Sequence, residues 1–291
     1  MAVTQESLRK RVRALIYGAL PTARPYQDVL QSNITSSGTS MVVLDGTRWA
    51  ENDVVDFPNG DQAIVAGVAA NTLTIRRGAN ATAHSTGEVI YKNPRFSTEA
   101  IDYAIDSVIQ DLFPDIYKIT TVSVTYDPQT EWYPINNDNL MEVLTIYYED
   151  HDYLEPRALP VWRQSRGVDA TEFGAAQGVF IPHSGGMHDG DTLYIVFRER
   201  IDAVDDLLDR QEHLVALGAA YQLLQVANVA RTHDPGRWTD RTVQPGQEGR
   251  DAIHFLRDFS LMRRREELRL MKDEDRLPKN PHAERARRFR L

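Results

Sequence analysis

Between residues 32 and 93 the sequence changes from helical to strand periodicity, and this change constrains the fold more than any other feature. Short apolar runs recur there about every ten residues: SMVVL (40–44), DVVDF (53–57), QAIVAGV (62–68), NTLTIRR (71–77) and EVIYK (88–92). Turn-forming pairs such as Asp45-Gly46 and Asn59-Gly60 separate them. Short strands at this spacing are typical of a small β-barrel or β-roll. Because helical sequence flanks the stretch, we expect an inserted module.

Other stretches have apolar residues at the three- and four-residue steps of amphipathic helices. They are residues 5–20, 94–118, 203–231 and 248–272. Thr4 with Ser7 is suited to cap the first of these helices, and Ser97 the second, with Thr98 as a second candidate. In the third, Gly218-Ala219-Ala220 forms a small-residue patch that allows close packing of helices.

Residues 119–201 return to strand patterns, with alternating runs such as KITTVSVTYD and strongly apolar ones such as NLMEVLTIYY. They predict a second antiparallel sheet or sandwich. The runs GVFIP and DTLYIVFRE lie on either side of the loop His183–Asp191, and we expect them to form an open hairpin.

Together these patterns predict an α+β fold. Residues 1–31, 94–118 and 202–272 form a helical scaffold that carries the small β-barrel-like module 32–93. The antiparallel β domain covers residues 119–201, and residues 273–291, which contain two prolines and little periodicity, form an extended basic C-terminal arm.

Charge is distributed unevenly along the chain. The net charge is −9, which argues against a general nucleic-acid binder. Residues 257–291 contain 12 Lys and Arg against 7 Asp and Glu, a net of +5, so the remainder carries −9 − 5 = −14. An acidic body with a basic tail suggests that the tail docks onto an acidic partner.

Two negative features limit the chemistry and the location. There is no cysteine, which excludes disulfides, thiolate nucleophiles and cysteine-based metal sites. The N-terminal stretch lacks the continuous apolar core of a secretory signal, and no run reaches the roughly 18 apolar residues that span a bilayer. We therefore expect a protein that is made in the cytoplasm and has no membrane segment.

No arrangement in the sequence predicts catalysis, so we expect neither an enzyme nor a cofactor. Nucleophile elbows, dinucleotide fingerprints and Walker loops are missing. The loop His183–Asp191 offers His183, His188, Asp189 and Asp191 as metal ligands, but a glycine-rich turn with solvated polar residues is the favoured interpretation, and we predict no metal site. His84 is expected to make a structural hydrogen bond, and His213 to pack within a helix.

Aromatic residues in the β segments allow two interpretations. They are Trp49, Trp132, Tyr133, Tyr147, Tyr148 and Trp162. Exposed rings of this kind form carbohydrate-binding platforms, whereas packing in cores and interfaces is the commoner use of Tyr and Trp.

One segment resembles a known family. The stretch RWAENDVVDFPNGDQAIVAGVAANTLTIRRGANATAHSTGEVIYKNPRFS is similar to a small β module found in head-to-tail connector (adaptor) proteins of tailed bacteriophages. The shared features are Trp49 at its start, the strand pair around Val68 and 71–74, the turn 77–79 and the exit 93–96 into a helix. The following STEAIDYAIDSVIQDLFPDIY, the strand GDTLYIVFRER and the helix ALGAAYQLLQ also resemble such proteins.

The resemblance implies a structural virion protein of the neck. Adaptors form rings, usually of twelve subunits, beneath the portal protein; they extend the channel through which double-stranded DNA passes without sequence-specific binding, and they receive stopper or tail proteins. Their C-terminal segments commonly grip the portal. Transferred to this chain, that role falls to Arg285, Arg287, Arg288, Phe289, Arg290 and Leu291.

Two alternatives remain open at this point. The β-rich middle also suits another tail or baseplate protein, such as a tail-tube subunit, although the long helices weigh against it. The aromatic strands and abundant acidic residues allow a carbohydrate-binding protein.

Overall fold

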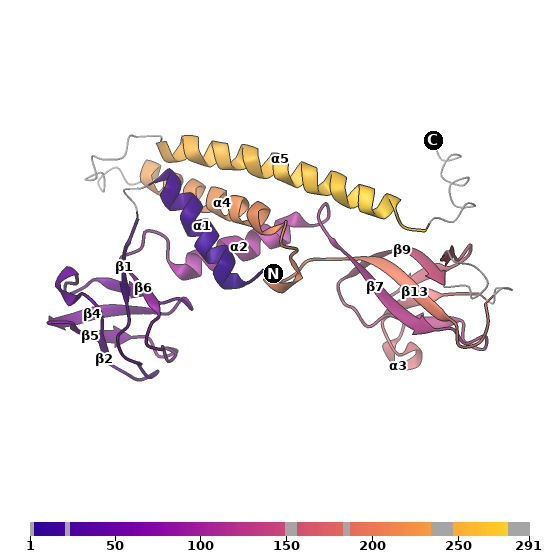
Figure 1. The fold of residues 1–291 in the computed structure, drawn as a ribbon, viewed down its shortest axis with the longest axis horizontal. Coiled ribbons are helices and arrows are strands. Elements are labelled where there is room, and N and C mark those ends of the chain that lie inside the picture. Colours follow the sequence, from indigo (N-terminus) through magenta and orange to yellow (C-terminus); the bar gives the residue numbers. More distant parts are fainter. Residues whose placement is uncertain (1–2, 21–23, 149–155, 183–186, 234–246, 279–291) are drawn as a thin grey trace. The chain divides into compact units, whose positions relative to one another are not determined.

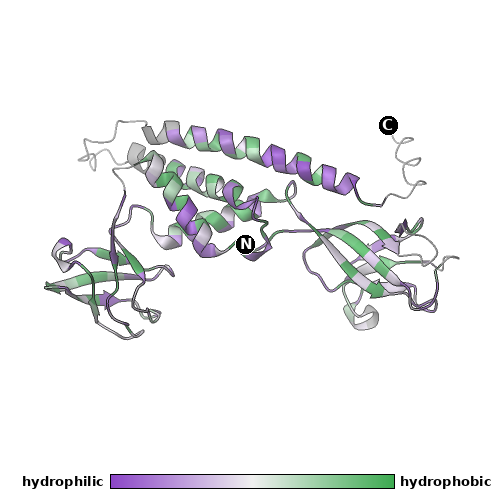
Figure 2. Cartoon of the chain, viewed as in Figure 1, coloured by the Kyte–Doolittle hydropathy of each residue, from purple (hydrophilic) through white to green (hydrophobic). Residues whose placement is uncertain are grey.

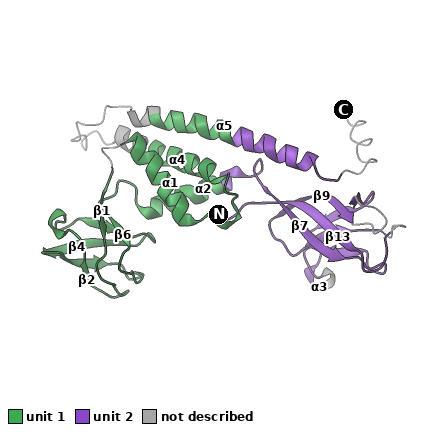
Figure 3. Cartoon of the chain, viewed as in Figure 1, with its two compact units in different colours: residues 1–109, 203–262 green, residues 110–202, 263–291 purple. Residues whose placement is uncertain are grey.

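The computed structural model describes residues 3–20, 24–148, 156–182, 187–233 and 247–278 (Figure 1). The chain divides into two compact units, which we describe separately (Figure 3). Unit 1 contains Met1–Ile109 and Ala203–Met262, and unit 2 contains Gln110–Asp202 and Arg263–Leu291. Helices and antiparallel sheets occur together, so the predicted mixed α+β class is confirmed.

Helices form one part of unit 1. They are α1 (Gln5–Ala19), α2 (Thr98–Leu112) as far as Ile109, α4 (Glu212–His233) and the first part of α5 (Gln247–Asp275). Both predicted N-caps are present: the Thr4 and Ser7 side chains form a reciprocal capping box, and the Ser97 hydroxyl accepts a hydrogen bond from the Ala100 N–H at 3.2 Å.

The third predicted helix begins later than expected. Residues Val204–Asp206 form the short 3-10 helix η3, and α4 starts only at Glu212. Gln211 is the reason, because its carbonyl accepts the first helical hydrogen bond from Val215, at 3.0 Å, while its side chain accepts one from the Leu208 N–H at 3.0 Å. The side-chain bond satisfies a donor ahead of the helix and fixes its first residue.

Gly218 lies where three helices meet. A Cβ atom on Gly218 of α4 would lie 2.8 Å from Cγ1 of Val108 on α2 and 2.9 Å from Cε2 of Phe259 on α5. The predicted close packing at this small-residue patch is therefore confirmed.

Unit 1 also contains a six-stranded antiparallel sheet in the order β1-β6-β3-β4-β5-β2. Its strands are β1 (Tyr26–Val29), β2 (Ser40–Val42), β3 (Val54–Asp56), β4 (Gln62–Ala69), β5 (Thr72–Arg77) and β6 (Val89–Lys92), with the 3-10 helix η2 (Gly46–Arg48) after β2. The sheet curls until its edges meet, since Gln31 donates to the Val42 carbonyl at 2.8 Å and Leu44 to the Val29 carbonyl at 3.2 Å. Apolar side chains including Val55, Phe57 and Leu73 fill its interior.

The five predicted strands of this sheet are present, and β1 is a sixth that the sequence pattern did not predict. β1 pairs with β6 through Tyr26 opposite Lys92 and Val29 opposite Val89. It reads YQDV, with a buried acidic residue in place of an apolar one. Asp28 is accommodated because its carboxylate accepts hydrogen bonds from the Val29 and Leu44 N–H groups, at 2.8 and 3.0 Å, and from the Trp49 indole at 2.9 Å.

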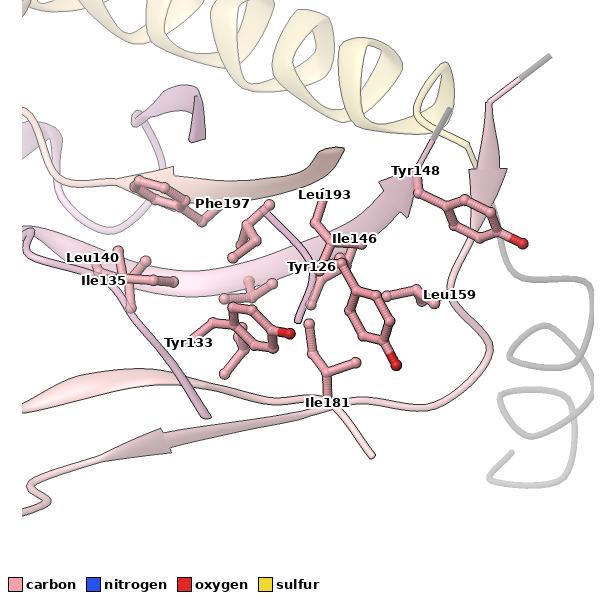
Figure 4. Packing of buried hydrophobic residues seen from close by; sticks show 13 residues of the cluster. Tyr126, Tyr133, Ile135, Leu140, Ile146, Tyr148, Leu159, Ile181, Leu193 and Phe197 are labelled. Carbon is pink, nitrogen blue, oxygen red and sulfur yellow. The ribbon is translucent and has the colours of Figure 1, made fainter. Parts of the chain in front are cut away.

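Unit 2 is built on two antiparallel sheets. One has the order β10-β9-β13-β7, and the other has the order β11-β12-β8. The elements are β7 (Lys118–Thr125), β8 (Trp132–Pro134), β9 (Leu140–Tyr148), β10 (Arg157–Ala158), β11 (Arg163–Arg166), α3 (Ala170–Phe173), β12 (Gln177–Phe180) and β13 (Thr192–Glu199). Buried residues of both sheets, such as Ile146, Val179 and Phe197, share one core (Figure 4).

The predicted hairpin around His183–Asp191 is wrong. β12 pairs with β8 and β11, whereas β13 pairs with β7 and β9 in the other sheet. Both edges of β13 are therefore occupied by strands from elsewhere in the sequence. The loop between β12 and β13 therefore connects strands of different sheets. Four of its residues, His183–Gly186, lie outside the described part of the chain.

The C-terminal arm also begins differently from the prediction. Helix α5 continues to Asp275, so the first residues of the expected arm 273–291 are helical, and residues 279–291 lie outside the described part of the chain. The helix continues because Glu274 is held by hydrogen bonds from two residues of unit 2. None of the helices described is both long and apolar enough to cross a lipid bilayer.

Candidate assembly surfaces

Glu274, in the last turn of α5, is bound by two side chains of unit 2. Nε and Nη2 of Arg198 on β13 donate to its carboxylate at 2.6 and 2.8 Å, and the Tyr117 hydroxyl donates at 2.6 Å. A guanidinium that binds both oxygens of a carboxylate makes one of the stronger contacts available to a protein side chain. Arg198 also lies over the Tyr117 ring, 4.8 Å from its centroid.

The protonation of these groups follows from their contacts. Burial by itself raises the pKa of the Glu274 carboxyl, but the hydrogen bonds from Arg198 and Tyr117 outweigh it, and the pKa is lowered. Burial and the bond to Glu274 raise the pKa of Tyr117, and the bond to Glu274 raises that of Arg198. Near neutral pH, Glu274 is thus a carboxylate that accepts from a neutral phenol and a cationic guanidinium.

A second contact follows directly along the chain. The Thr145 hydroxyl on β9 donates to the Pro278 carbonyl at 3.0 Å. Within the same unit, Leu270 of α5 and Val196 of β13 are buried. The end of α5 and the residues up to Pro278 are therefore fixed to the outer side of the four-stranded sheet, which sets the point from which the arm continues.

Helix α5 carries apolar side chains on two sides. Ala252 and Leu270 lie on the side that is buried. On another side, at 3.6 residues per turn, apolar side chains are exposed to solvent; they are Ile253 (65%), Leu261 (49%), Leu268 (44%) and Met271 (53%). We call this set the α5 outer face. Figure 2 shows apolar residues interspersed among hydrophilic ones along α5. An exposed apolar row on a long helix is a common mark of an interaction surface.

The exposed side of helix α2 is acidic. The helix contains Glu99, Asp102, Asp106 and Asp111 and no Lys or Arg. Asp102 pairs with Arg9 of α1 at 2.6 Å. Partial burial, and next the negative charge of Asp102, raise the pKa of Asp106. We call the exposed residues Glu99, Tyr103 and Asp106 the α2 outer face. Tyr103 lies in its middle, with 77% of its surface exposed.

A buried polar cluster joins α1 and α2 to the sheet of unit 1. The Thr98 hydroxyl accepts from Nη2 of Arg13 at 2.6 Å and donates to Asp56 at 2.6 Å. The Arg13 guanidinium lies 4.1 Å from the Tyr91 ring centroid. Burial raises the pKa of Asp56, although hydrogen bonds from Thr98 oppose the effect. Desolvation raises the pKa of the neighbouring Tyr17 to about 12.

The histidines singled out in the sequence have structural surroundings. His84 is buried, stacks on Phe57 at 4.0 Å between ring centroids and contacts Glu88 at 2.9 Å, which confirms its structural role. His213 is partly buried in α4, and desolvation lowers its pKa.

Of the candidate metal ligands, His183 lies outside the described part of the chain, and the Nδ1 atom of His188 lies 4.0 Å from the Asp191 carboxylate. Asp191 accepts from the His188 N–H at 2.7 Å, a turn contact, while the His188 side chain is exposed. Within the described residues, no group of three or more His, Asp or Glu side chains is placed to hold a metal ion.

The aromatic residues are divided between core and surface. Trp49, Tyr133 and Tyr148 are buried, and Trp162 packs against the core of unit 2, as the packing interpretation predicts. Tyr147 and Tyr194 stack with their centroids 5.0 Å apart on neighbouring strands. Trp132 and Tyr147 are partly buried.

The predicted partner-binding residues Arg285, Arg287, Arg288, Phe289, Arg290 and Leu291 lie outside the described part of the chain. Sequence reasoning missed Glu274, which it placed in the extended arm 273–291, because its partners Tyr117 and Arg198 are distant in sequence. It also missed the α2 outer face, although the absence of Lys and Arg from that helix was a visible signal.

Compared with known proteins, the chain matches no family model, no curated protein and no solved structure at a significant level.

Proposed function

We propose that this protein is a structural virion subunit, a head-to-tail adaptor that forms a ring, of twelve copies in the usual case, beneath the portal of a tailed bacteriophage. In this proposal a helical scaffold carries the inserted barrel-like module and a second antiparallel β region. The ring extends the DNA channel, joins the capsid to stopper or tail proteins, and is non-enzymatic. Its location is the virion neck, after synthesis in the host cytoplasm.

The observation that carries the proposal is the fixed start of the C-terminal arm. Glu274 and Pro278 are bound to unit 2 just before a segment with the sequence KNPHAERARRFRL. A basic segment that leaves from a fixed point reaches a partner with less loss of conformational entropy than one that hangs from a mobile end.

The chemistry of the arm suits an acidic groove on a portal. Arg285, Arg287, Arg288 and Arg290 offer forked guanidinium donors that match carboxylates, and Phe289 offers an aromatic anchor. The remaining chain is acidic, which favours a lumen that repels DNA and lets it slide.

A truncation tests the arm. Deleting residues 279–291 should abolish binding to purified portal and leave the circular dichroism spectrum and thermal midpoint unchanged. A matched control replaces four arginines of the arm with Lys: Arg285, Arg287, Arg288 and Arg290. The change keeps the positive charge and removes the forked guanidinium donors. Full portal binding by the truncated chain would contradict the proposed role.

Electron microscopy tests the ring. Purified protein, alone or with portal, should give twelve-fold rings, and cross-linking of purified virions should join the chain to portal. A six-fold ring would favour a tail-tube protein instead. Absence of the chain from the neck of virions would refute the adaptor role.

A further inference from the structure

We propose that the α5 outer face of one copy of this chain binds the α2 outer face of a second copy. The contact rests on the proposed ring, for which it supplies the joint between neighbouring subunits. Because it joins two different patches of the same molecule, the contact is heterologous.

The α5 side presents a charged and apolar row. Arg257, Leu261 and Arg265 follow one another at intervals of four residues and are all exposed. Residues at this interval lie on the same face of a helix. Two cations therefore flank one leucine, with Ile253 and Leu268 extending the apolar surface at either end.

The α2 side presents the complementary row. Glu99, Tyr103 and Asp106 are exposed at intervals of four and three residues, so two anions flank one aromatic ring. At 1.5 Å per residue, the two anions lie about 10 Å apart along their helix and the two cations about 12 Å apart along theirs. When the two helices lie side by side, Tyr103 packs on Leu261, and each of the two anions pairs with one of the two arginines.

Among the described residues, no ion pair engages Glu99, Asp106, Arg257 or Arg265 within the chain. Among the neighbouring residues, Asp102 is bound to Arg9, Arg263 to Asp115, and Arg264 to Glu267. Partial burial, and next the negative charge of Asp102, raise the pKa of Asp106, and a cation from another copy would offset both effects by favouring the charged carboxylate.

Charge favours pairing of the α2 outer face with the α5 outer face over pairing of two identical faces. Two α2 outer faces placed together would oppose acid with acid, and two α5 outer faces would oppose Arg257 and Arg265 with each other. Only the mixed pairing is attractive. Heterologous contacts of this kind close into rings when the rotation per subunit closes, as the proposed function requires.

A charge-swap experiment tests the contact in the full chain. The α2 variant is Glu99→Lys/Asp106→Lys, and the α5 variant is Arg257→Glu/Arg265→Glu. Each should lose assembly by more than tenfold in concentration, measured by mass photometry and sedimentation velocity, because like charges then meet. An equimolar mixture should regain assembly, since an alternating ring contains only attractive contacts. The cis quadruple variant should also assemble.

Control variants reverse the same kinds of charge at other exposed positions of unit 1. Glu51→Lys, in the turn before β3, and Arg76→Glu, on β5, alter exposed residues and should assemble like the unchanged chain. Circular dichroism checks that each variant is folded.

The outcomes separate the contact from the adaptor role. Normal assembly of the α2 variant, or a mixture that stays monomeric, overturns the contact, as does an unchanged chain that is monomeric both alone and with portal. Rings that pass the swap test but are not found in the virion neck keep the contact and refute the adaptor.

Discussion

Glu274 and Arg198 form a forked ion pair, with two guanidinium nitrogens 2.6 and 2.8 Å from the two carboxylate oxygens. The residues are far apart in sequence, and the pair fixes the end of α5 to β13. The third guanidinium nitrogen of Arg198, Nη1, donates a hydrogen bond to the Glu142 carboxylate at 3.1 Å. Arg198 and Tyr117 hold the end of the helix, and the Thr145 hydroxyl holds Pro278 just after it.

Replacing Glu274 with Gln should destabilise unit 2. The substitution keeps the size of the side chain but removes the charge that Arg198 and Tyr117 bind, and charge-assisted hydrogen bonds of this type contribute about 1.5–3 kcal/mol. We expect a loss near the lower end of that range in urea unfolding. Glu142→Gln is the control, because Glu142 is more exposed and its pair should contribute about 0–1 kcal/mol. Equal losses from both variants would contradict the assignment.

The same carboxyl should make stability depend on pH. The folded state lowers the pKa of Glu274 below its ordinary value of 4.5. Its contribution is therefore fully present above pH 4.5 and is lost as the pH falls through the folded-state pKa. The difference in unfolding free energy between the unchanged chain and Glu274→Gln should shrink as the pH is lowered from 7 to 3. A difference that is independent of pH would show that the charge of Glu274 is not what stabilises the contact.

Replacing Gly218 with Ala should be destabilising even though alanine is the better helix former. The added Cβ would lie 2.8 Å from Val108 and 2.9 Å from Phe259, and overpacking of this kind costs about 1–3 kcal/mol. Gly18 in α1 is the matched control, since a Cβ there meets nothing within 4 Å. Gly18→Ala should stabilise by up to about 1 kcal/mol. Thermal melts that move in the same direction for both would refute the close packing at Gly218.

Local patterns in the sequence predicted most of the elements because each depends on neighbouring residues. The Thr4–Ser7 capping box and the apolar spacing of α2 are of this kind, as are the five strands of unit 1 that were predicted. Strand β1 was missed because its Asp28 is buried, and only donors from elsewhere, such as the Trp49 indole, make that burial possible.

Pairing between distant segments could not be predicted in the same way. The expected β12–β13 hairpin failed because β13 pairs with β7 and β9 over long sequence separations, and no local signal reports such competition. Glu274 was overlooked for the same reason. An acidic run at the end of a helix is usually solvated, and its partners Tyr117 and Arg198 are identified only when the sheet is formed.

The hydroxyl of Thr98 should matter more than its methyl group. It accepts from Arg13 and donates to Asp56, both at 2.6 Å, so Thr98→Val removes a partner from two buried charged groups while keeping the shape of the side chain. Hydrogen bonds to charged groups contribute about 1.5–3 kcal/mol each, and Asp56 keeps its bond from the Thr98 backbone N–H at 3.0 Å. Thr98→Ser keeps the hydroxyl and loses one methyl group, at about 1 kcal/mol. We therefore expect Thr98→Val to unfold at clearly lower urea concentration than Thr98→Ser. The reverse order would mean that packing, rather than the Arg13–Thr98–Asp56 chain of hydrogen bonds, holds α1 and α2 to the sheet of unit 1.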